Sequence, residues 1–189
     1  MNYEKSKIRK KFITIRKKNY SKIKKFPFHL IFKLVNKIFK NKKIKIGGYY
    51  PYNYEVSVLN FLNDANKKKY VTSLPKIKKK NLMIFKNWNF RDPLYVNKYG
   101  ILEPKNDKKE IIPELILVPL LAFDKKFDRI GYGKGYYDRY LKKISKKKKV
   151  IAIGIAYSFQ RYSNIPNNKF DYRLDYIFSE KGFIKWQKY

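Results

Sequence analysis

The sequence predicts an α/β layer fold with a largely parallel sheet. Short apolar segments of strand length alternate with amphipathic helical segments along most of the chain. A glycine-rich stretch at 129–139 follows one of the apolar segments, as a loop between a strand and a helix would. Ligands of such sheets gather at the carboxyl ends of the strands, so a binding site is expected there.

Four helices are expected. The segment 5–18 has apolar residues at i, i+4 and i+7 counted from Ile8, and 28–39 repeats apolar residues at helical spacing. A helix is also expected to begin at or near Glu55 and to run to about Asn63, with the carboxylate in its first turn. The residues after Gly135 are expected to begin the fourth.

The strands are expected at Ile44 to Tyr50, Lys69 to Leu74, Leu82 to Trp88, Leu115 to Val118, Val150 to Ala156 and Asp175 to Phe178. Gly47 and Gly48 within the first of them indicate either a bulge or the close approach of another backbone. Their order in the sheet does not follow from the sequence.

Length and composition favour one domain over residues 1–189, since 44% of the residues are hydrophobic and no linker divides the chain. The absence of cysteine excludes disulfides, zinc-thiolate sites and thiol nucleophiles. The longest apolar stretch, 111–123, is interrupted by two prolines and a glutamate, so no membrane span is expected. With no apolar leader visible, we expect a cytoplasmic protein.

The net charge of +33 raises the question of nucleic-acid binding. Only seven of the 47 cationic side chains are arginines, whereas phosphate and base recognition favours the arginine fork. The lysines accompany abundant Ile, Asn, Tyr and Phe, which is typical of an A/T-rich genome. We therefore expect no specific nucleic-acid partner, although a basic nucleic-acid-binding protein stays an alternative.

The stretch from Arg129 to Arg139 combines three alternating glycines with a lysine, tyrosines and an aspartate. Glycines at 131, 133 and 135 allow positive φ and bring backbone N–H groups close to an anion, and a helix N-terminus behind them favours phosphate. The spacing matches neither the dinucleotide-binding nor the Walker pattern. From the glycines alone, a surface turn between strand and helix is the favoured interpretation.

The full string resembles the signature of the 5-formyltetrahydrofolate cyclo-ligase family, R-[LI]-G-x-G-x-G-[YF]-Y-D-R preceded by V-P-x-x-x-F-D, here 118–124. The resemblance extends over nearly the whole chain. It includes Lys5-x-x-x-Arg9, Tyr49-Tyr50-Pro51 with Glu55, the segment 99–104, Gln160, Pro166, Asp171 and Asp175. It implies a three-layer α/β/α fold of the NagB/RpiA/CoA-transferase-like kind.

The resemblance also implies an activity: a ligase that cyclises 5-formyltetrahydrofolate to 5,10-methenyltetrahydrofolate at the expense of ATP, with Mg²⁺. The γ-phosphoryl group would move to the formyl oxygen, and nitrogen 10 would attack the activated carbon. Such chemistry needs cations and a metal around the moving phosphoryl group. The expected partner is a small folate, possibly polyglutamylated, and the expected state is a monomer.

Site residues are carried over from the resemblance position by position. Lys134 and Arg129 are predicted to be catalytic. The nucleotide is predicted to contact Lys5, Arg9, Arg129, Ile130, Gly131, Tyr132, Gly133, Lys134, Gly135, Tyr136 and Tyr137. The folate is predicted to contact Tyr50, Glu55, Tyr99, Tyr132, Gly133, Lys134, Gly135 and Tyr136. Asp138 and Asp171 are the candidate metal ligands.

Structural alternatives stay open for several of these residues. Lys5 and Arg9 fit an ordinary solvated helix face, Asp138 a helix start and Asp171 a turn. Tyr136 and Tyr137 fit core positions equally well. The sequence departs from the family pattern at Phe170, where many members have histidine. A fold relative that acts on phosphosugars or acyl-CoA is the remaining alternative.

Overall fold

The computed structural model describes residues 3–23, 25–79 and 82–185. The main sheet contains β1 (Lys45–Gly47), β2 (Val71–Ile77), β3 (Met83–Asn87), β6 (Glu110–Ile111), β7 (Leu115–Pro119), β10 (Ile151–Ile155), β11 (Tyr176–Ser179) and β12 (Gly182–Phe183). Two hairpins stand outside it, β4 (Leu94–Val96) with β5 (Leu102–Pro104), and β8 (Ala122–Phe123) with β9 (Arg129–Ile130). The helices are α1 (Tyr3–Asn19), α2 (His29–Phe39), α3 (Leu59–Lys67) and α4 (Tyr136–Ser145), with 3-10 turns η1 (Tyr20–Lys22) and η2 (Ser158–Gln160).

The strand order of the main sheet is β12-β11-β10-β7-β1-β2-β3-β6. The strands from β11 to β2 pair in parallel, while β12, β3 and β6 join antiparallel at the two edges. The predicted largely parallel sheet is thus confirmed, and its carboxyl ends lie on one side.

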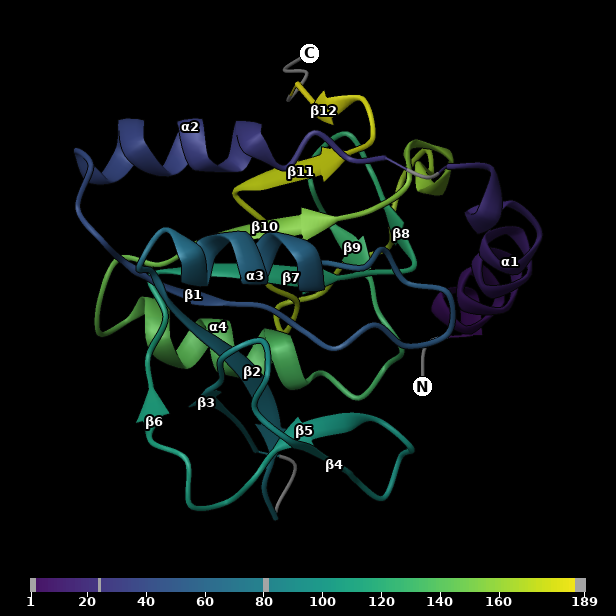
Figure 1. Cartoon of the computed structure of the whole chain (residues 1–189). Helices are drawn as coiled ribbons and strands as arrows, with labels where there is room; N and C mark the ends of the chain where they lie inside the picture. Colours follow the sequence, from purple (N-terminus) through teal and green to yellow (C-terminus); the bar gives the residue numbers. More distant parts are fainter. Residues whose placement is uncertain (1–2, 24, 80–81, 186–189) are drawn as a thin grey trace.

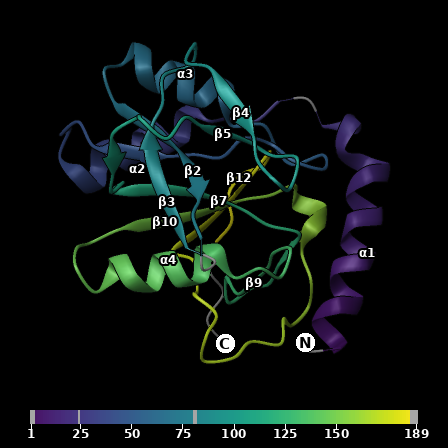
Figure 2. The same ribbon diagram turned by 90° about the horizontal axis from the view of Figure 1, so that it is seen from below.

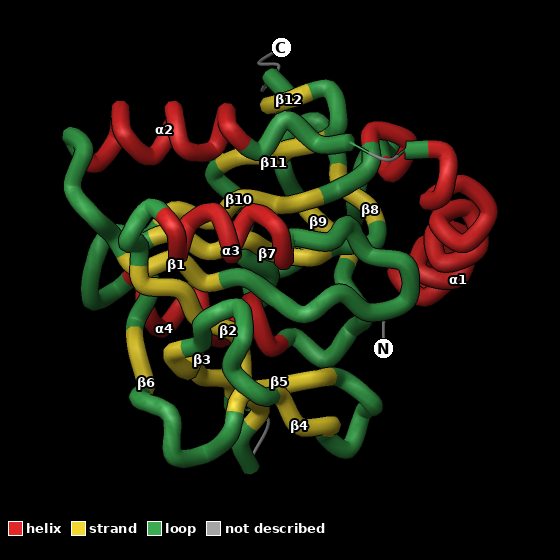
Figure 3. Tube along the Cα trace, in the orientation of Figure 1, coloured by secondary structure: helices red, strands yellow, loops and turns green. Residues whose placement is uncertain are grey.

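Side chains of β7 show how the layers form. Leu115 and Leu117 pack into the core shared with α2 and α3, whereas Ile116 and Val118 pack into the core shared with α4. A parallel strand buried on both faces is a continuous apolar run for this reason. The result is the expected α/β/α arrangement, with α2 and α3 on one face of the sheet and α4 on the other (Figures 1 and 3).

Helix α1 belongs to neither layer. Figure 2 shows it standing to one side of the sheet. Its apolar stripe, Ile8 and Phe12, packs instead on Leu121, Ala122 and Ile130 of the β8–β9 region, beyond the carboxyl end of β7. The stripe was predicted from periodicity, but its partner was not, and this placement sets the cations of α1 beside the glycine loop.

The structure differs from the sequence prediction at the first strand and the helix that follows it. β1 ends at Gly47, three residues before the predicted end, and α3 begins at Leu59 instead of near Glu55. Glu55 lies in a turn, where its N–H donates to the carbonyl of Tyr52, and buried Val56 and Val58 hold the chain before the helix. The prediction that Glu55 occupies a first helical turn was wrong, because burial of the valines outweighed the dipole argument.

The glycine pair has a packing explanation. A Cβ on Gly47 would lie 2.7 Å from a ring carbon of Phe85, and one on Gly48 would lie 2.5 Å from a methyl group of Leu62. The close approach is therefore made by side chains, one from β3 of the same sheet and one from α3, not by another backbone. None of the described helices is long and apolar enough to cross a bilayer.

Candidate functional site

A pocket of about 720 Å³ lies between α1, the glycine loop and the β4–β5 hairpin. All sixteen predicted site residues line it. It brings together the glycine loop and the segment that follows β1, as the sequence predicted. The sequence argument missed an apolar part of the lining made by Pro75, Ile77 and Met83 of β2 and β3, with Ile101 and Leu102 of the hairpin. The residues of β2 and β3 carry only an ordinary strand pattern, so no sequence signal distinguishes them from core positions, whereas Ile101 and Leu102 lie in the segment 99–104 that the family resemblance already included.

The glycine loop is shaped by two of its three glycines. Gly133 and Gly135 have φ of +92° and +65°, and Gly135 precedes α4 in the left-handed conformation. The expectation of positive φ at Gly131 was wrong. A Cβ there would meet nothing within 4 Å, and its carbonyl accepts a bond of 2.9 Å from Arg9 Nε. The loop thus presents the N-terminus of α4 to the pocket, a favourable place for an anion.

The loop does not follow β7 directly. The small β8–β9 hairpin stands between them, and buried Asp124 organises its turn by accepting N–H bonds from Lys126, Asp128 and Ile165. The hairpin therefore accounts for the distance in sequence between the apolar strand β7, the Phe123-Asp124 pair and the glycine loop. The hairpin sets where Arg129 and the loop begin.

Two ion pairs hold the basic side of the pocket. Lys5 Nζ pairs with Asp171 Oδ2 at 2.5 Å, and Arg129 Nη2 pairs with Asp138 Oδ1 at 2.7 Å. Arg129 also donates to the carbonyl of Tyr172, and only 5% of its side chain is exposed. Arg129 is therefore already engaged in contacts within the protein. Lys134, by contrast, is exposed, and its ammonium lies 5.8 Å from the ring centre of Tyr99.

Both candidate metal ligands face this pocket. Asp138 Oδ1 accepts from Arg129 and from the N–H of Tyr172, and Asp171 Oδ2 accepts from Lys5 and from the N–H of Asn168. No cluster of three or more metal-binding side chains occurs in the described ranges. Two carboxylates beside a phosphate site nevertheless fit Mg²⁺, which takes few protein ligands and completes its octahedron with phosphate oxygens and water.

The segment after β1 contributes Glu55 to the pocket lining, where the residue is partly exposed. Its Oε2 accepts a bond of 3.0 Å from the N–H of Tyr52. Burial raises the pKa of Glu55 to about 7, although the positive charge of Arg16 and the Tyr52 N–H bond lower it. A partly buried acceptor of this kind suits a heterocycle with paired N–H donors.

Aromatic side chains complete the pocket. The hydroxyls of Tyr99 and Tyr136 lie 3.1 Å apart and join the β4–β5 hairpin to the start of α4. Tyr50 also lines the pocket, and the Tyr137 hydroxyl is buried without a hydrogen-bond partner in the described structure. Burial raises the pKa of Tyr136 to about 12 and that of Tyr137 further, so both phenols stay protonated.

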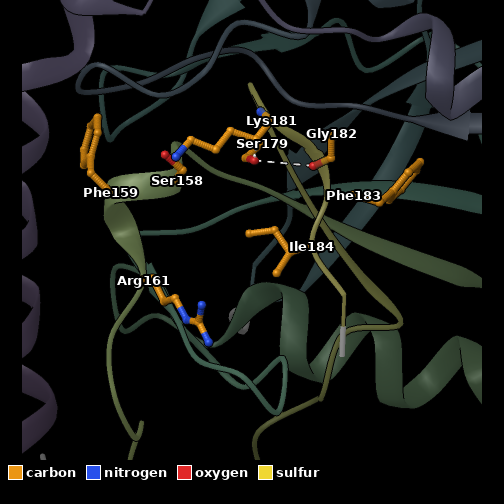
Figure 4. Close-up of a pocket in the computed structure, with 8 residues that line it drawn as sticks. All are labelled: Ser158, Phe159, Arg161, Ser179, Lys181, Gly182, Phe183 and Ile184. Carbon is orange, nitrogen blue, oxygen red and sulfur yellow. Dashed lines mark hydrogen bonds between the residues drawn. The ribbon is translucent and has the colours of Figure 1, made fainter. Parts of the chain in front are cut away.

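A second hollow, of about 480 Å³, lies between η2 and the β11–β12 hairpin. Figure 4 shows its lining: two cations, Arg161 and Lys181, with serine hydroxyls and aromatic rings around them. It contains no predicted site residue and no carboxylate, so the larger pocket is the candidate active site.

Comparison with known proteins agrees with this geometry. The family model described as "5-formyltetrahydrofolate cyclo-ligase family" matches residues 1–180. The chain belongs to the 5-formyltetrahydrofolate cyclo-ligase family. Membership places it among ligases, and the resemblance found in the glycine-loop signature is confirmed.

Curated relatives carry the same name. The chain is 31% identical over 147 residues to the 5-formyltetrahydrofolate cyclo-ligase of Haemophilus influenzae, covering 74% of this chain and 78% of that protein. It is 46% identical over 88 residues to that of Mycoplasma genitalium, covering 45% of this chain. That match spans about half the length of the Mycoplasma genitalium protein, 52%.

Solved structures show the same fold. The 5,10-methenyltetrahydrofolate synthetase of Aquifex aeolicus superposes with a TM-score of 0.73 at 28% identity, covering 97% of this chain and 93% of that one. The corresponding protein of Mycoplasma pneumoniae gives 0.69 at 26% identity, covering 95% and 99%.

Proposed function

We propose that this protein is a 5-formyltetrahydrofolate cyclo-ligase that converts 5-formyltetrahydrofolate and ATP to 5,10-methenyltetrahydrofolate, ADP and phosphate. The observation that carries the proposal is the shared pocket. One side offers a glycine loop, a helix N-terminus and cations, while the other offers a partly buried carboxyl among aromatic rings. A polyphosphate and a reduced pterin are the two ligands that these sides suit.

Different residues of the pocket bind the phosphates and the folate. The loop from Arg129 to Gly135 binds the phosphates, with Lys134 as the local cation and Lys5 and Arg9 reaching in from α1. Glu55 accepts hydrogen bonds from the pterin, and Tyr50, Tyr99 and Tyr136 pack around it. Tyr132 and Gly133 lie between the two ligands and contact both.

The reaction then requires positioning more than covalent help from the protein. The formyl group on nitrogen 5 is amide-like and a poor electrophile. Its oxygen attacks the γ-phosphorus and displaces ADP, nitrogen 10 attacks the activated formyl carbon, and phosphate leaves to give the methenyl bridge. Lys134 and Arg129 offset the negative charge at the transferred phosphoryl group.

Asp138 and Asp171 would hold Mg²⁺ beside the phosphates. When bound, the ion would neutralise phosphate charge and orient the γ-phosphoryl group. Both aspartates pair with cations that also line the pocket, so they would have to exchange these partners to hold the ion. Lys5 and Arg129 would then turn from carboxylate toward phosphate.

The direct test is to incubate purified protein with 5-formyltetrahydrofolate, ATP and Mg²⁺ and to follow the near-ultraviolet absorption of the methenyl product. We expect product that depends on all three, with ADP formed in equal amount. Failure to form product with any nucleotide would exclude the proposed activity.

We further propose that residues 1–189 act as one catalytic domain, as a monomer in the cytoplasm, with no specific nucleic-acid or membrane partner.

A further inference from the structure

Arg16 is a buried cation that the pocket lining does not include. The residue is 1% exposed, which makes it the largest fully buried side chain described. Its Nη1 donates to the carbonyl of Leu120 at 3.2 Å, just beyond β7, and its Nη2 donates to the hydroxyl of Tyr132. Its Nε is buried with no hydrogen-bond partner in the described structure. A charge in this position is costly unless another group compensates it.

The first group that Arg16 controls belongs to the glycine loop. Its guanidinium carbon lies 5.7 Å from the ring centre of Tyr132, in addition to the bond to the hydroxyl. The same ring meets Tyr52 edge-on at 5.8 Å, on the segment that leads to Glu55. Tyr132 is thus held between α1 and the folate side of the pocket, and the loop that carries Lys134 is held with it.

The second group is Glu55. Arg16 is the cation whose field lowers the pKa of that carboxyl against the larger effect of burial. Other groups near Glu55 are phenols: Tyr49 after β1, Tyr132 on the loop and Tyr137 in α4. Arg16 and Glu55 form no direct ion pair among the described residues, so the carboxylate stays available to a ligand.

We propose that Arg16 is a positioning residue for the reaction: from behind the pocket wall it holds Tyr132, and with it the phosphate loop, in register with the folate, and its positive charge favours the carboxylate form of Glu55. This inference rests on the proposed function. It adds a residue that touches neither ligand yet acts on the binding sites of both.

The test separates charge from geometry. Arg16→Met removes both. Arg16→Lys keeps a cation but loses the planar fork that reaches two acceptors. Tyr132→Phe removes only the hydroxyl. Lys17→Met is the matched control, since it removes an exposed cation from the same helix.

The first measurement is independent of turnover. The carboxyl of Glu55 is titrated by carbon-13 NMR in protein with labelled glutamate, assigned with Glu55→Gln. In Arg16→Met we expect the midpoint of Glu55 to rise by about one pH unit, since a tenfold change in ionisation equals one unit. It should stay near the wild-type value in Arg16→Lys, Tyr132→Phe and Lys17→Met. An unchanged midpoint in folded Arg16→Met overturns the proposal.

The second measurement is kinetic. In Arg16→Met the acid limb of kcat/KM for 5-formyltetrahydrofolate should move to higher pH by the same amount as the NMR midpoint. In Arg16→Lys and Tyr132→Phe the limb should stay in place while KM for ATP rises about fivefold, the effect of one hydrogen bond. A variant that loses thermal stability but keeps both pH limb and KM would show that Arg16 only anchors α1, which refutes the proposal.

The two proposals fail in different ways. If the wild-type protein forms no methenyl product, the proposed function is wrong, while the NMR midpoint still decides whether Arg16 controls the ionisation of Glu55. If Arg16→Met does not fold, Arg16→Lys and Tyr132→Phe still decide the positioning role through KM for ATP. An unchanged KM in both would refute it.

Discussion

The two sides of the pocket treat charge in opposite ways. On the phosphate side, the aspartates Asp138 and Asp171 each pair directly with a cation, Arg129 or Lys5. On the folate side, partly buried Glu55 accepts one backbone N–H bond and has no ion pair among the described residues, and its pKa rises to about 7. On the phosphate side, each carboxylate has a cationic partner even without a ligand. On the folate side, the carboxyl group has no such partner among the described residues.

This difference indicates how each side would meet its ligand. Paired charges keep a site ordered and inexpensive to maintain, but a ligand must replace the existing partners. An incompletely compensated, partly buried carboxyl destabilises the free protein and gains most when a ligand brings hydrogen-bond donors. The phosphate side should therefore respond to loss of a cation mainly in catalysis, and the folate side should respond in both stability and pH dependence.

The largest effect is expected for Lys134→Ala. Lys134 is exposed and borders the pocket, so its loss should lower kcat about a hundredfold or more, as for removal of other transition-state charge partners. The free energy of unfolding should change little. Steady-state kinetics and urea unfolding give the two numbers. Lys143→Ala, an exposed position on α4, is the control and should match wild type. Equal turnover in both variants would show that the loop lysine takes no part in the chemistry.

Glu55→Gln tests the folate side of the pocket through its effect on the free energy of unfolding. Because the pKa of Glu55 is raised from 4.5 to about 7, the folded state holds its proton more tightly, and wild-type stability falls as pH rises from 4.5 through 7. Glutamine lacks this titration. Relative to wild type, the variant should therefore gain up to roughly 3 kcal/mol at pH 8 and little at pH 5.

Urea unfolding at several pH values tests this, with half-exposed Glu110→Gln as control. The same Glu55 variant should lose folate turnover, because its amide presents a donor where the carboxylate offered an acceptor. A difference in stability between Glu55→Gln and wild type that does not vary with pH would contradict the assignment of the raised pKa.

Asp138→Asn tests the phosphate side of the pocket, where each aspartate pairs with a cation. The substitution removes a negative charge that holds Arg129 and faces the phosphate site, so the apparent affinity for Mg²⁺ should fall about tenfold or more. Turnover measured across a Mg²⁺ titration gives the result, and substitution of an exposed residue of α3, Asp64→Asn, is the control. If the Mg²⁺ dependence of Asp138→Asn overlays that of the control, Asp138 serves only to orient Arg129.

The smallest effect is expected for Tyr99→Phe. This change removes the hydroxyl that meets Tyr136 at 3.1 Å and keeps the ring. One partly exposed hydrogen bond contributes about 1 kcal/mol, so KM for 5-formyltetrahydrofolate should rise about fivefold with kcat nearly unchanged. Tyr95→Phe in β4 of the same hairpin is the matched control. A large fall in kcat would instead show that the hairpin takes part in the chemical step.

Much of the fold was predictable because burial of one face of a helix or strand produces a periodic pattern of apolar residues in the sequence. The apolar run 115–118 identified β7, and the i, i+4, i+7 pattern identified the stripe of α1. The glycine signature named the loop and, through the family resemblance, the residues that now line one pocket. The two-residue strands β6, β8 and β12 were missed because so short a segment has no period.

The sequence by itself determined the α/β class, the residues of the loop and the candidate ligands of phosphate, folate and metal. Tertiary structure alone decided that α1 stands beside the carboxyl ends of the strands, that Arg16 reaches a tyrosine 116 residues away, and that Glu55 becomes partly buried with a raised pKa. The physical reason is that periodicity records which side of a segment is buried, whereas the partner that buries it, and the charge left there, depend on contacts between distant segments.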